Sequence, residues 1–152
     1  MTASATIGEA ATCGNNNLCV EQVHSPQHAI DPSENEIQRA VFAHLRTRGA
    51  PGVFAFHPKN GGIHQRGRAR GINAGLGVVS GVPDVIILQH GHIYGLELKR
   101  TKGKLADEQN EALLRMKAAG AKVAVAYGLD AAILWLEAHG LLRGSQSPQM
   151  RG

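Results

Sequence analysis

Two stretches near the middle of the chain carry the apolar pattern of β-strands. Residues 84–88 read DVIIL and residues 93–99 read IYGLELK, and both are rich in the β-branched and aliphatic side chains that strands favour. His90 and Gly91 lie between them and suit a two-residue turn, because glycine accepts the positive φ that such a turn requires. The pattern therefore predicts one β-hairpin.

A helical pattern precedes the hairpin over residues 34–48. Its apolar stripe at helical spacing consists of Ile37, Val41, Phe42 and Leu45. Ser33 is the expected N-cap, and Glu36 stands at the capping-box position three residues later. The segment 49–52 reads GAPG and is expected to end this helix.

The rest of the domain reads as further strands and helices. In chain order these are a strand at 53–57, a short helix within 67–77, a helix at 107–119, a strand at 122–127 and a helix at 131–139. Asp107 and Asp130 are expected to cap the two later helices. The order α-β-β-β-α-β-α, with the short helix left aside, predicts an α/β fold in which helices flank a mixed central sheet. A right-handed βαβ crossover places the helix at 107–119 on one face.

A single domain is expected over residues 33–143, in a chain of 152 residues that is long enough for one core. Residues 1–32 are rich in Ala, Thr, Ser, Asn and Gly without periodicity, so we expect a flexible N-terminal tail, and residues 144–152 read as a C-terminal tail. No apolar run approaches the roughly 20 residues that span a membrane. The N-terminus also lacks the basic and apolar regions of a secretory signal. We therefore expect no membrane partner and a cytoplasmic location.

Both cysteines lie in the expected N-terminal tail. Cys13 and Cys19 match no common zinc-site spacing, so we expect thiols without a structural role. His24 and His28 follow them and leave a metal clip of two cysteines and two histidines as an alternative.

Charge is distributed unevenly along the chain. Residues 1–36 hold five acidic residues and no Lys or Arg, whereas residues 37–152 hold all 16 basic residues and the other seven acidic ones, a net charge of +9. No acid occurs from Ile37 through Pro83. Such an excess of positive charge favours a polyanionic partner, and a generally basic soluble protein is the alternative.

The expected hairpin places two carboxylates opposite each other. If the turn sets the register, Asp84 faces Glu97 with the Cβ separation of roughly 4.5–5.5 Å that directly opposed residues have. Lys99 then points to the same face as Glu97. Two such carboxylates repel each other, and a divalent cation such as Mg²⁺ offsets the repulsion and assists phosphoryl chemistry. The alternative is a strand-edge acid beside a surface ion pair of Glu97 and Lys99.

These residues belong to a longer pattern of the form PD…ExK, which here is Pro83-Asp84 followed by Glu97-Leu98-Lys99. The accompanying segments are GVPDVI at 81–86, LELK at 96–99, GKL at 103–105, AGAKV at 119–123 and HPKNGG at 57–62. From about residue 33 to residue 142 the chain resembles a VRR-NUC (virus-type replication-repair nuclease) domain. This resemblance implies the restriction-endonuclease-like core of the PD-(D/E)XK superfamily.

The resemblance also implies a function and a metal site. It implies a DNA endonuclease dependent on Mg²⁺ or Mn²⁺, of the phage or prophage type, acting in recombination, repair or replication in the cytoplasm of a bacterial or phage-infected cell. Asp84, Glu97 and the main-chain carbonyl of Leu98 would bind the metal. Lys99 would position or activate the attacking water.

Two further catalytic candidates come from the flanking helices. Glu34 corresponds to the acid that the family carries on its N-terminal helix, and it shares a helix face with the apolar stripe, whereas Glu36 points away from it. Gln109 corresponds to the glutamine of the family's site. The alternatives are a first-turn acid favoured by the helix dipole for Glu34 and an ordinary exposed helix residue for Gln109.

Basic and polar residues near the motif are expected to bind DNA. They are Lys59, Asn60, Arg66, Arg68, Arg70, Lys102 and Lys104. Phosphate contacts give affinity without sequence readout, and the chain carries no helix-turn-helix or zinc-finger pattern. We therefore expect selection of branched or junction DNA by its shape.

A domain of this size has too little surface to hold both arms of a branched substrate, and the resemblance to junction-resolving relatives implies a homodimer. The alternative function is a non-catalytic DNA-binding module on the same fold. The acid pair speaks against that alternative, because repelling carboxylates have no use in a groove that only binds DNA.

Overall fold

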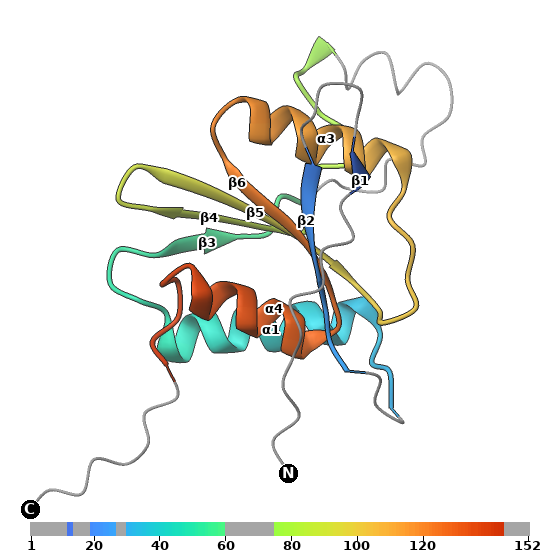
Figure 1. Cartoon of the computed structure of the whole chain (residues 1–152). Coiled ribbons are helices and arrows are strands. Elements are labelled where there is room, and N and C mark those ends of the chain that lie inside the picture. The colour runs from blue at the N-terminus through green and yellow to red at the C-terminus, as the bar shows by residue number, and fades with distance from the viewer. Residues whose placement is uncertain (1–11, 14–18, 27–29, 60–74, 145–152) are drawn as a thin grey trace, which may run out of the picture.

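The computed structural model describes residues 12–13, 19–26, 30–59 and 75–144. These form a six-stranded mixed sheet in the order β1-β2-β6-β5-β4-β3, with helices on both faces (Figure 1). The strands are β1 (Thr12–Cys13), β2 (Cys19–His24), β3 (Phe54–Phe56), β4 (Val85–Gln89), β5 (His92–Lys99) and β6 (Lys122–Tyr127). The helices are α1 (Glu34–Arg48), α3 (Asp107–Ala118) and α4 (Leu129–Ala138).

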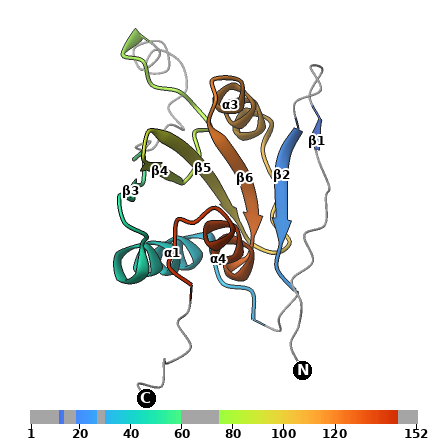
Figure 2. The ribbon, with the colours of Figure 1, turned by 60° about the vertical axis from the view of Figure 1, so that its left-hand side comes forward.

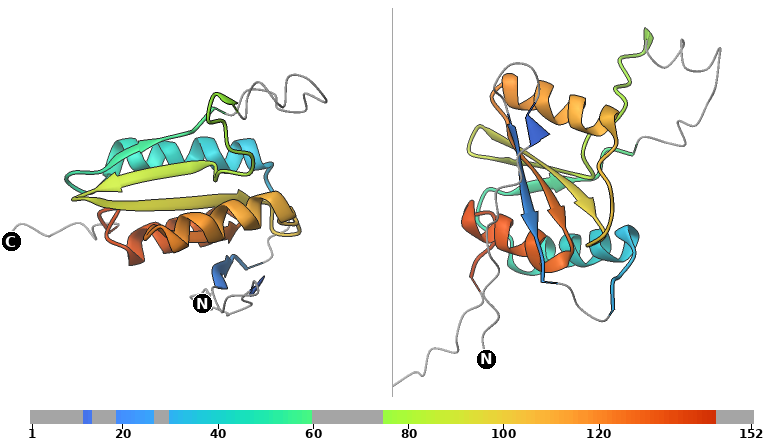
Figure 3. Two further views of the ribbon diagram at one scale, coloured as in Figure 1. Left: turned by 90° about the horizontal axis from the view of Figure 1, so that it is seen from above. Right: turned by 45° about the vertical axis from the view of Figure 1, so that its right-hand side comes forward.

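The sheet lies between α3 on one face and the α1–α4 pair on the other (Figures 1, 2 and 3). Leu96 and Leu98 of β5 belong to the larger core cluster beneath α1 and α4, and Leu113 belongs to a smaller cluster beneath α3. Because successive strand residues point to opposite faces, Glu97 and Lys99 lie on the face that α3 covers. The fold therefore buries a carboxylate and an ammonium group beneath α3.

The hairpin of β4 and β5 has the predicted register. Val85 pairs with Leu96, so the next position outward places Asp84 opposite Glu97. Both residues of the turn have positive φ, 48° and 80°, as a two-residue turn that matches the strand twist requires. β4 begins at Val85, one residue later than expected, because Asp84 forms a bend before the strand.

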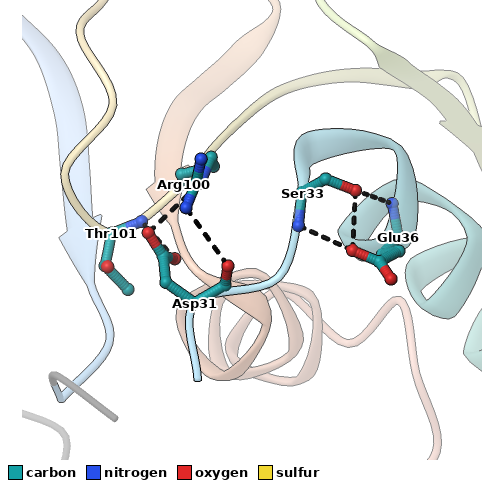
Figure 4. A network of polar contacts seen from close by, with 5 residues as sticks. All are labelled: Asp31, Ser33, Glu36, Arg100 and Thr101. Atoms are coloured by element: carbon teal, nitrogen blue, oxygen red, sulfur yellow. Dashed lines mark hydrogen bonds and ion pairs between the residues drawn. The ribbon is translucent and has the colours of Figure 1, made fainter. Parts of the chain in front are cut away.

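α1 has the predicted bounds and the predicted cap. The Ser33 hydroxyl accepts a hydrogen bond from the main-chain N–H of Glu36 at 3.3 Å, and Glu36 Oε2 accepts one from the main-chain N–H of Ser33 at 2.8 Å (Figure 4). Ile37, Val41 and Leu45 are buried on the side toward the sheet. Glu36 is thus occupied by capping, as its position away from the apolar stripe indicated.

The caps predicted for the two later helices are wrong. Ala106 and Gly128 are the N-caps of α3 and α4, and Asp107 and Asp130 lie inside the first turns, where the helix dipole favours a carboxylate. Ser25 Oγ instead accepts the N–H of residue 131 at 2.7 Å at the start of α4. A residue distant in sequence supplies this cap, so local sequence does not reveal it.

The prediction of a flexible tail over residues 1–32 is wrong for β2. This strand pairs in parallel with β6, and its Val20 and Val23 are 0% and 2% exposed. Six residues with two inward valines carry little periodicity, and neighbouring β6 supplies the stability of the strand. Cys19 is disulfide-bonded rather than the free thiol that we expected, and His24 stacks on Tyr127 with ring centroids 4.4 Å apart.

Several expectations fall outside the described residues. They concern most of residues 1–18, most of the short helix within 67–77, His28, and the C-terminal tail from residue 145 onward. None of the helices in the described part of the chain has the length and apolarity that crossing a bilayer requires.

Candidate active site

The start of β4 and the end of β5 bring two carboxylates to one edge of the sheet. Asp84 Oδ2 accepts the main-chain N–H of Leu98 at 3.1 Å. The Asp84 side chain thus extends the hydrogen bonding between β4 and β5 beyond the last main-chain pair, and its carboxylate is held beside β5. Burial raises the pKa of Asp84, while the N–H of Leu98 and the charge of Lys99 act against the rise.

Glu97 is the buried member of the pair, with 1% of its surface exposed. Its Oε1 accepts a hydrogen bond from Gln109 Nε2 and lies 3.0 Å from Lys99 Nζ. Burial, followed by the charge of Asp84, raises the pKa of Glu97 to about 7 in spite of the Lys99 cation. A buried acid whose pKa is raised by burial and by a second carboxylate is typical of functional sites.

Lys99 connects this pair to α1. Its Nζ lies 3.7 Å from Glu34 Oε1, in addition to its ion pair with Glu97. Burial by itself lowers the pKa of Lys99, but the carboxylates of Glu97, Glu34 and Asp84 outweigh it, and the pKa lies above its ordinary value. Lys99 is therefore a buried cation at neutral pH, within the field of three carboxylates.

The segment before α1 is fixed to the end of β5. Asp31 accepts hydrogen bonds from the main-chain N–H of Thr101 at 3.1 Å and from Arg100 Nε at 3.2 Å (Figure 4). The main-chain hydrogen bond from Thr101 is the largest cause that lowers the pKa of Asp31. Because Glu34 follows three residues later, this connection places the first turn of α1 beside Lys99.

Gln109 connects the acid pair to α3. Its Nε2 donates to Glu97, and its Oε1 accepts the main-chain N–H of Ala106 at 3.0 Å, so both ends of the amide are fixed. The loop before β4 packs closely on the same helix turn. A Cβ at Gly81, which has a φ of +76°, would lie 2.2 Å from the carbonyl oxygen of Glu108. Glycine is therefore required for this close approach.

The donor set fits a hard divalent cation. Asp84 and Glu97 supply two carboxylates, and the single positive charge of Lys99 cannot neutralise both when both are ionised. The main-chain N–H and C=O of a strand residue point to the same neighbour, so the Leu98 carbonyl points to the side of Asp84. The next carbonyl, that of Lys99, accepts the N–H of Gly128 on the β6 side at 2.8 Å.

Within the described ranges, no three or more His, Cys, Asp or Glu side chains form a group that would hold a metal ion. Mg²⁺ does not need such a cage, because it is usually bound by one or two carboxylates, with waters and substrate phosphates completing its shell. The residues present therefore suit Mg²⁺ or Mn²⁺ better than an ion that demands four protein ligands.

The structure gathers the six predicted catalytic and metal residues at this edge, but only part of the predicted DNA-binding set can be placed. Lys59, Lys102 and Lys104 are exposed, and the last two lie in the loop that joins β5 to α3. Outside the described residues lie Asn60, Arg66, Arg68 and Arg70.

Three contributors to the site lie outside the predicted catalytic, metal and DNA-binding residues. Asp31 orients the start of α1, His57 Nδ1 forms a hydrogen bond with the main-chain oxygen of Asp84 at 2.7 Å, and buried Tyr127 pairs with Lys99 across β5 and β6. The position of Tyr127 could have been predicted, because the strands expected at 93–99 and 122–127 are parallel neighbours and end at Lys99 and Tyr127. The other two depend on contacts between distant segments.

Comparison with known proteins bears on the fold. No family model matches the sequence, and no curated protein matches it. A solved structure described as a VRR_NUC domain protein superposes with a TM-score of 0.54 and 19% sequence identity, covering 71% of this chain and 88% of that one. A second, described as a VRR_NUC domain, gives a TM-score of 0.46 and 17% identity, covering 68% of this chain and 94% of that one. On the strength of the first, the chain has the α/β fold of a VRR-NUC domain, as its sequence motifs indicated.

Proposed function

We propose that this chain is a metal-dependent DNA endonuclease that hydrolyses phosphodiester bonds. The observation that supports this most is the burial of Glu97, an acid that is 1% exposed and whose pKa is raised to about 7 beside Asp84 and a lysine cation. A protein that only binds DNA gains nothing from such a pair. A cation site for phosphoryl transfer requires it.

The contacts of each residue support a distinct role. Asp84, Glu97 and the Leu98 carbonyl would hold Mg²⁺ or Mn²⁺, which when bound polarises a phosphoryl oxygen and acidifies water. Lys99 orients the attacking water and stabilises the negative charge that builds on the phosphate.

The two flanking residues keep this set in place. Gln109 fixes the orientation of the Glu97 carboxylate through its amide, as residues around a metal ligand commonly do. Glu34 holds the Lys99 ammonium group from the side of α1.

The substrate that we propose is branched or junction DNA, cut in recombination, repair or replication by an enzyme of the phage or prophage type in the cytoplasm. Exposed Lys59 lies two residues after His57, which contacts Asp84, and exposed Lys102 and Lys104 follow the end of β5, so all three suit phosphate contacts. The described residues contain no element that reads base sequence, which favours recognition by shape.

A homodimer would give such an enzyme two sites for the two arms of a junction. An apolar face on β3, β4 and β5 supports this proposal: Phe54, Leu88 and Ile93 are 65%, 40% and 46% exposed. They are neighbours across the three strands, and contiguous exposed apolar residues mark interfaces. Light scattering should give a dimer that Phe54→Ser weakens. A wild-type monomer with and without DNA would remove the proposal.

Cleavage of labelled linear, flap and four-way-junction DNA tests the function, with Mg²⁺, Mn²⁺ or EDTA. We expect metal-dependent cutting by wild type that is lost in Asp84→Ala and in Lys99→Ala. Tight DNA binding without cutting by all three proteins would instead support a non-catalytic DNA-binding module.

A further inference from the structure

A cavity of about 490 Å³ lies beside the proposed active site, on the side of α1. It is lined by Asn35, Gln38, Arg39, Phe42, Arg46 and His57. All but the last belong to one flank of α1, which runs beneath the β3 edge of the sheet (Figure 2). A volume of this size is typical of sites that hold small organic molecules.

The lining has the chemistry of a nucleotide site. Arg39 and Arg46 are exposed cations, and none of the described lining residues is acidic. The side-chain amides of Asn35 and Gln38 have no hydrogen-bond partner in the described part of the chain, so their donors and acceptors are available. Phe42 packs against the core and also borders the cavity. Guanidinium groups bind phosphates, and an aromatic side chain can stack on a base.

The cavity begins at the reacting edge of the sheet. His57, which borders it, forms the 2.7 Å hydrogen bond with the main-chain oxygen of Asp84. From Arg39 to Arg46 the helix rises about 10 Å at about 1.5 Å per residue. Successive phosphates of one strand of duplex DNA rise about 3.4 Å along the helix axis, so this length corresponds to about three phosphate steps.

We propose that this cavity holds unpaired nucleotides of the DNA strand that is cut, next to the scissile phosphate. Arg39 and Arg46 bind the phosphates of this segment, and Phe42 contacts a base or sugar. Contact between a base and Phe42 requires an accessible base face, which stacking hides inside a duplex, so the occupant is unpaired. The inference rests on the proposed nuclease function and adds that the preferred substrate is single-stranded on one side of the cut.

Binding measurements in EDTA test the cavity without any contribution from catalysis. Fluorescence anisotropy would compare wild type, Arg39→Gln, Arg46→Gln and the double variant on DNA with a single-stranded flank and on fully paired DNA. Lys122→Gln is the control, because it removes one positive charge from an exposed residue away from the site. Lys122 begins β6, whereas Tyr127, which pairs with Lys99, ends it.

We expect each arginine variant to bind flanked DNA about tenfold more weakly, as the loss of a hydrogen bond to a charged group does. The slope of log affinity against log salt should fall by about 0.7 for each single-strand phosphate contact that is removed. Fully paired DNA and the Lys122→Gln control should show neither change. Equal binding of flanked DNA by wild type and double variant would overturn the inference, and so would an equal loss on fully paired DNA.

Cleavage by the wild type separates the two proposals. If wild type cuts DNA but the double variant binds flanked DNA normally, the cavity inference fails and the nuclease stands. If the arginine effect appears on flanked DNA alone but wild type cuts nothing, the cavity is a nucleotide site and the proposed nuclease fails.

Discussion

Replacing Glu97 with Gln should remove a pH dependence of stability that the metal-free wild type shows. Glu97 is 1% exposed, and its pKa rises from an ordinary 4.5 to about 7 in the folded protein. Between these two pH values the native state binds up to one more proton than the unfolded state, so the free energy of unfolding falls as pH rises. At about 1.36 kcal/mol per pH unit, the loss over this window is about 3 kcal/mol.

Urea unfolding in EDTA between about pH 5 and about pH 8 measures this loss. In Glu97→Gln the amide oxygen still accepts the hydrogen bond from Gln109, but it does not titrate. The variant should therefore lose much less stability over the same range, with a residual slope from Asp84, whose pKa burial also raises. Mg²⁺ added at high pH should stabilise wild type and have little effect on the variant, because a ligand that binds only the native state stabilises it by mass action.

The same pH dependence in both proteins, with no effect of Mg²⁺ on either, would refute the reasoning. Glu97 would then be an acid that the fold accommodates without cost, and its burial would not point to a cation. Only the slopes are compared, so a uniform destabilisation by the substitution does not affect the result.

Three other predictions follow from the site. Lys99→Met should lower single-turnover cleavage by about 10²–10³-fold, the cost of one lost donor to developing charge, while DNA affinity in EDTA changes little; an equal loss of both would assign Lys99 to binding alone. Gln109→Ala should weaken Mn²⁺ binding by about 10–100-fold by releasing Glu97, which calorimetry measures, and unchanged affinity would count against that role. Gly81→Ala should lower the melting temperature by more than about 2–4 °C, as a loss of over about 1 kcal/mol does in a chain of this size. Gly77→Ala is its control, since Gly77 has a similar φ of +79° but nothing within 4 Å of an added Cβ, and equal losses in the two variants would show that the clash at Gly81 does not matter.

The hairpin and α1 could be predicted because their signals are local. A two-residue turn at His90-Gly91 allows one register, and that register sets Asp84 opposite Glu97. The capping box at the start of α1 likewise needs only residues three positions apart. Where a short segment determines its own geometry, the sequence is enough.

The features that escaped prediction depend on distant segments. β2 is stabilised by its parallel pairing with β6, and the sequence of Cys19–His24 carries no pattern of its own that predicts a strand. Asp31 acts on Arg100 and Thr101 across about 70 positions of the chain. From the sequence, the polar residues of α1 that line the cavity can be identified only as one exposed side of a helix. The cavity is completed by His57, which follows β3 and is distant from them in sequence.

The central claim is that Asp84 and Glu97 together hold a divalent cation at this edge of the sheet. Calorimetric titration of Mn²⁺ into the metal-free protein at about pH 6, with uncleavable flanked DNA present, tests it most directly. The account predicts saturable binding accompanied by proton release, because a metal displaces the proton from Glu97, and a loss of both in Asp84→Asn. Absence of saturable binding to wild type, or equal binding by Asp84→Asn, would contradict it.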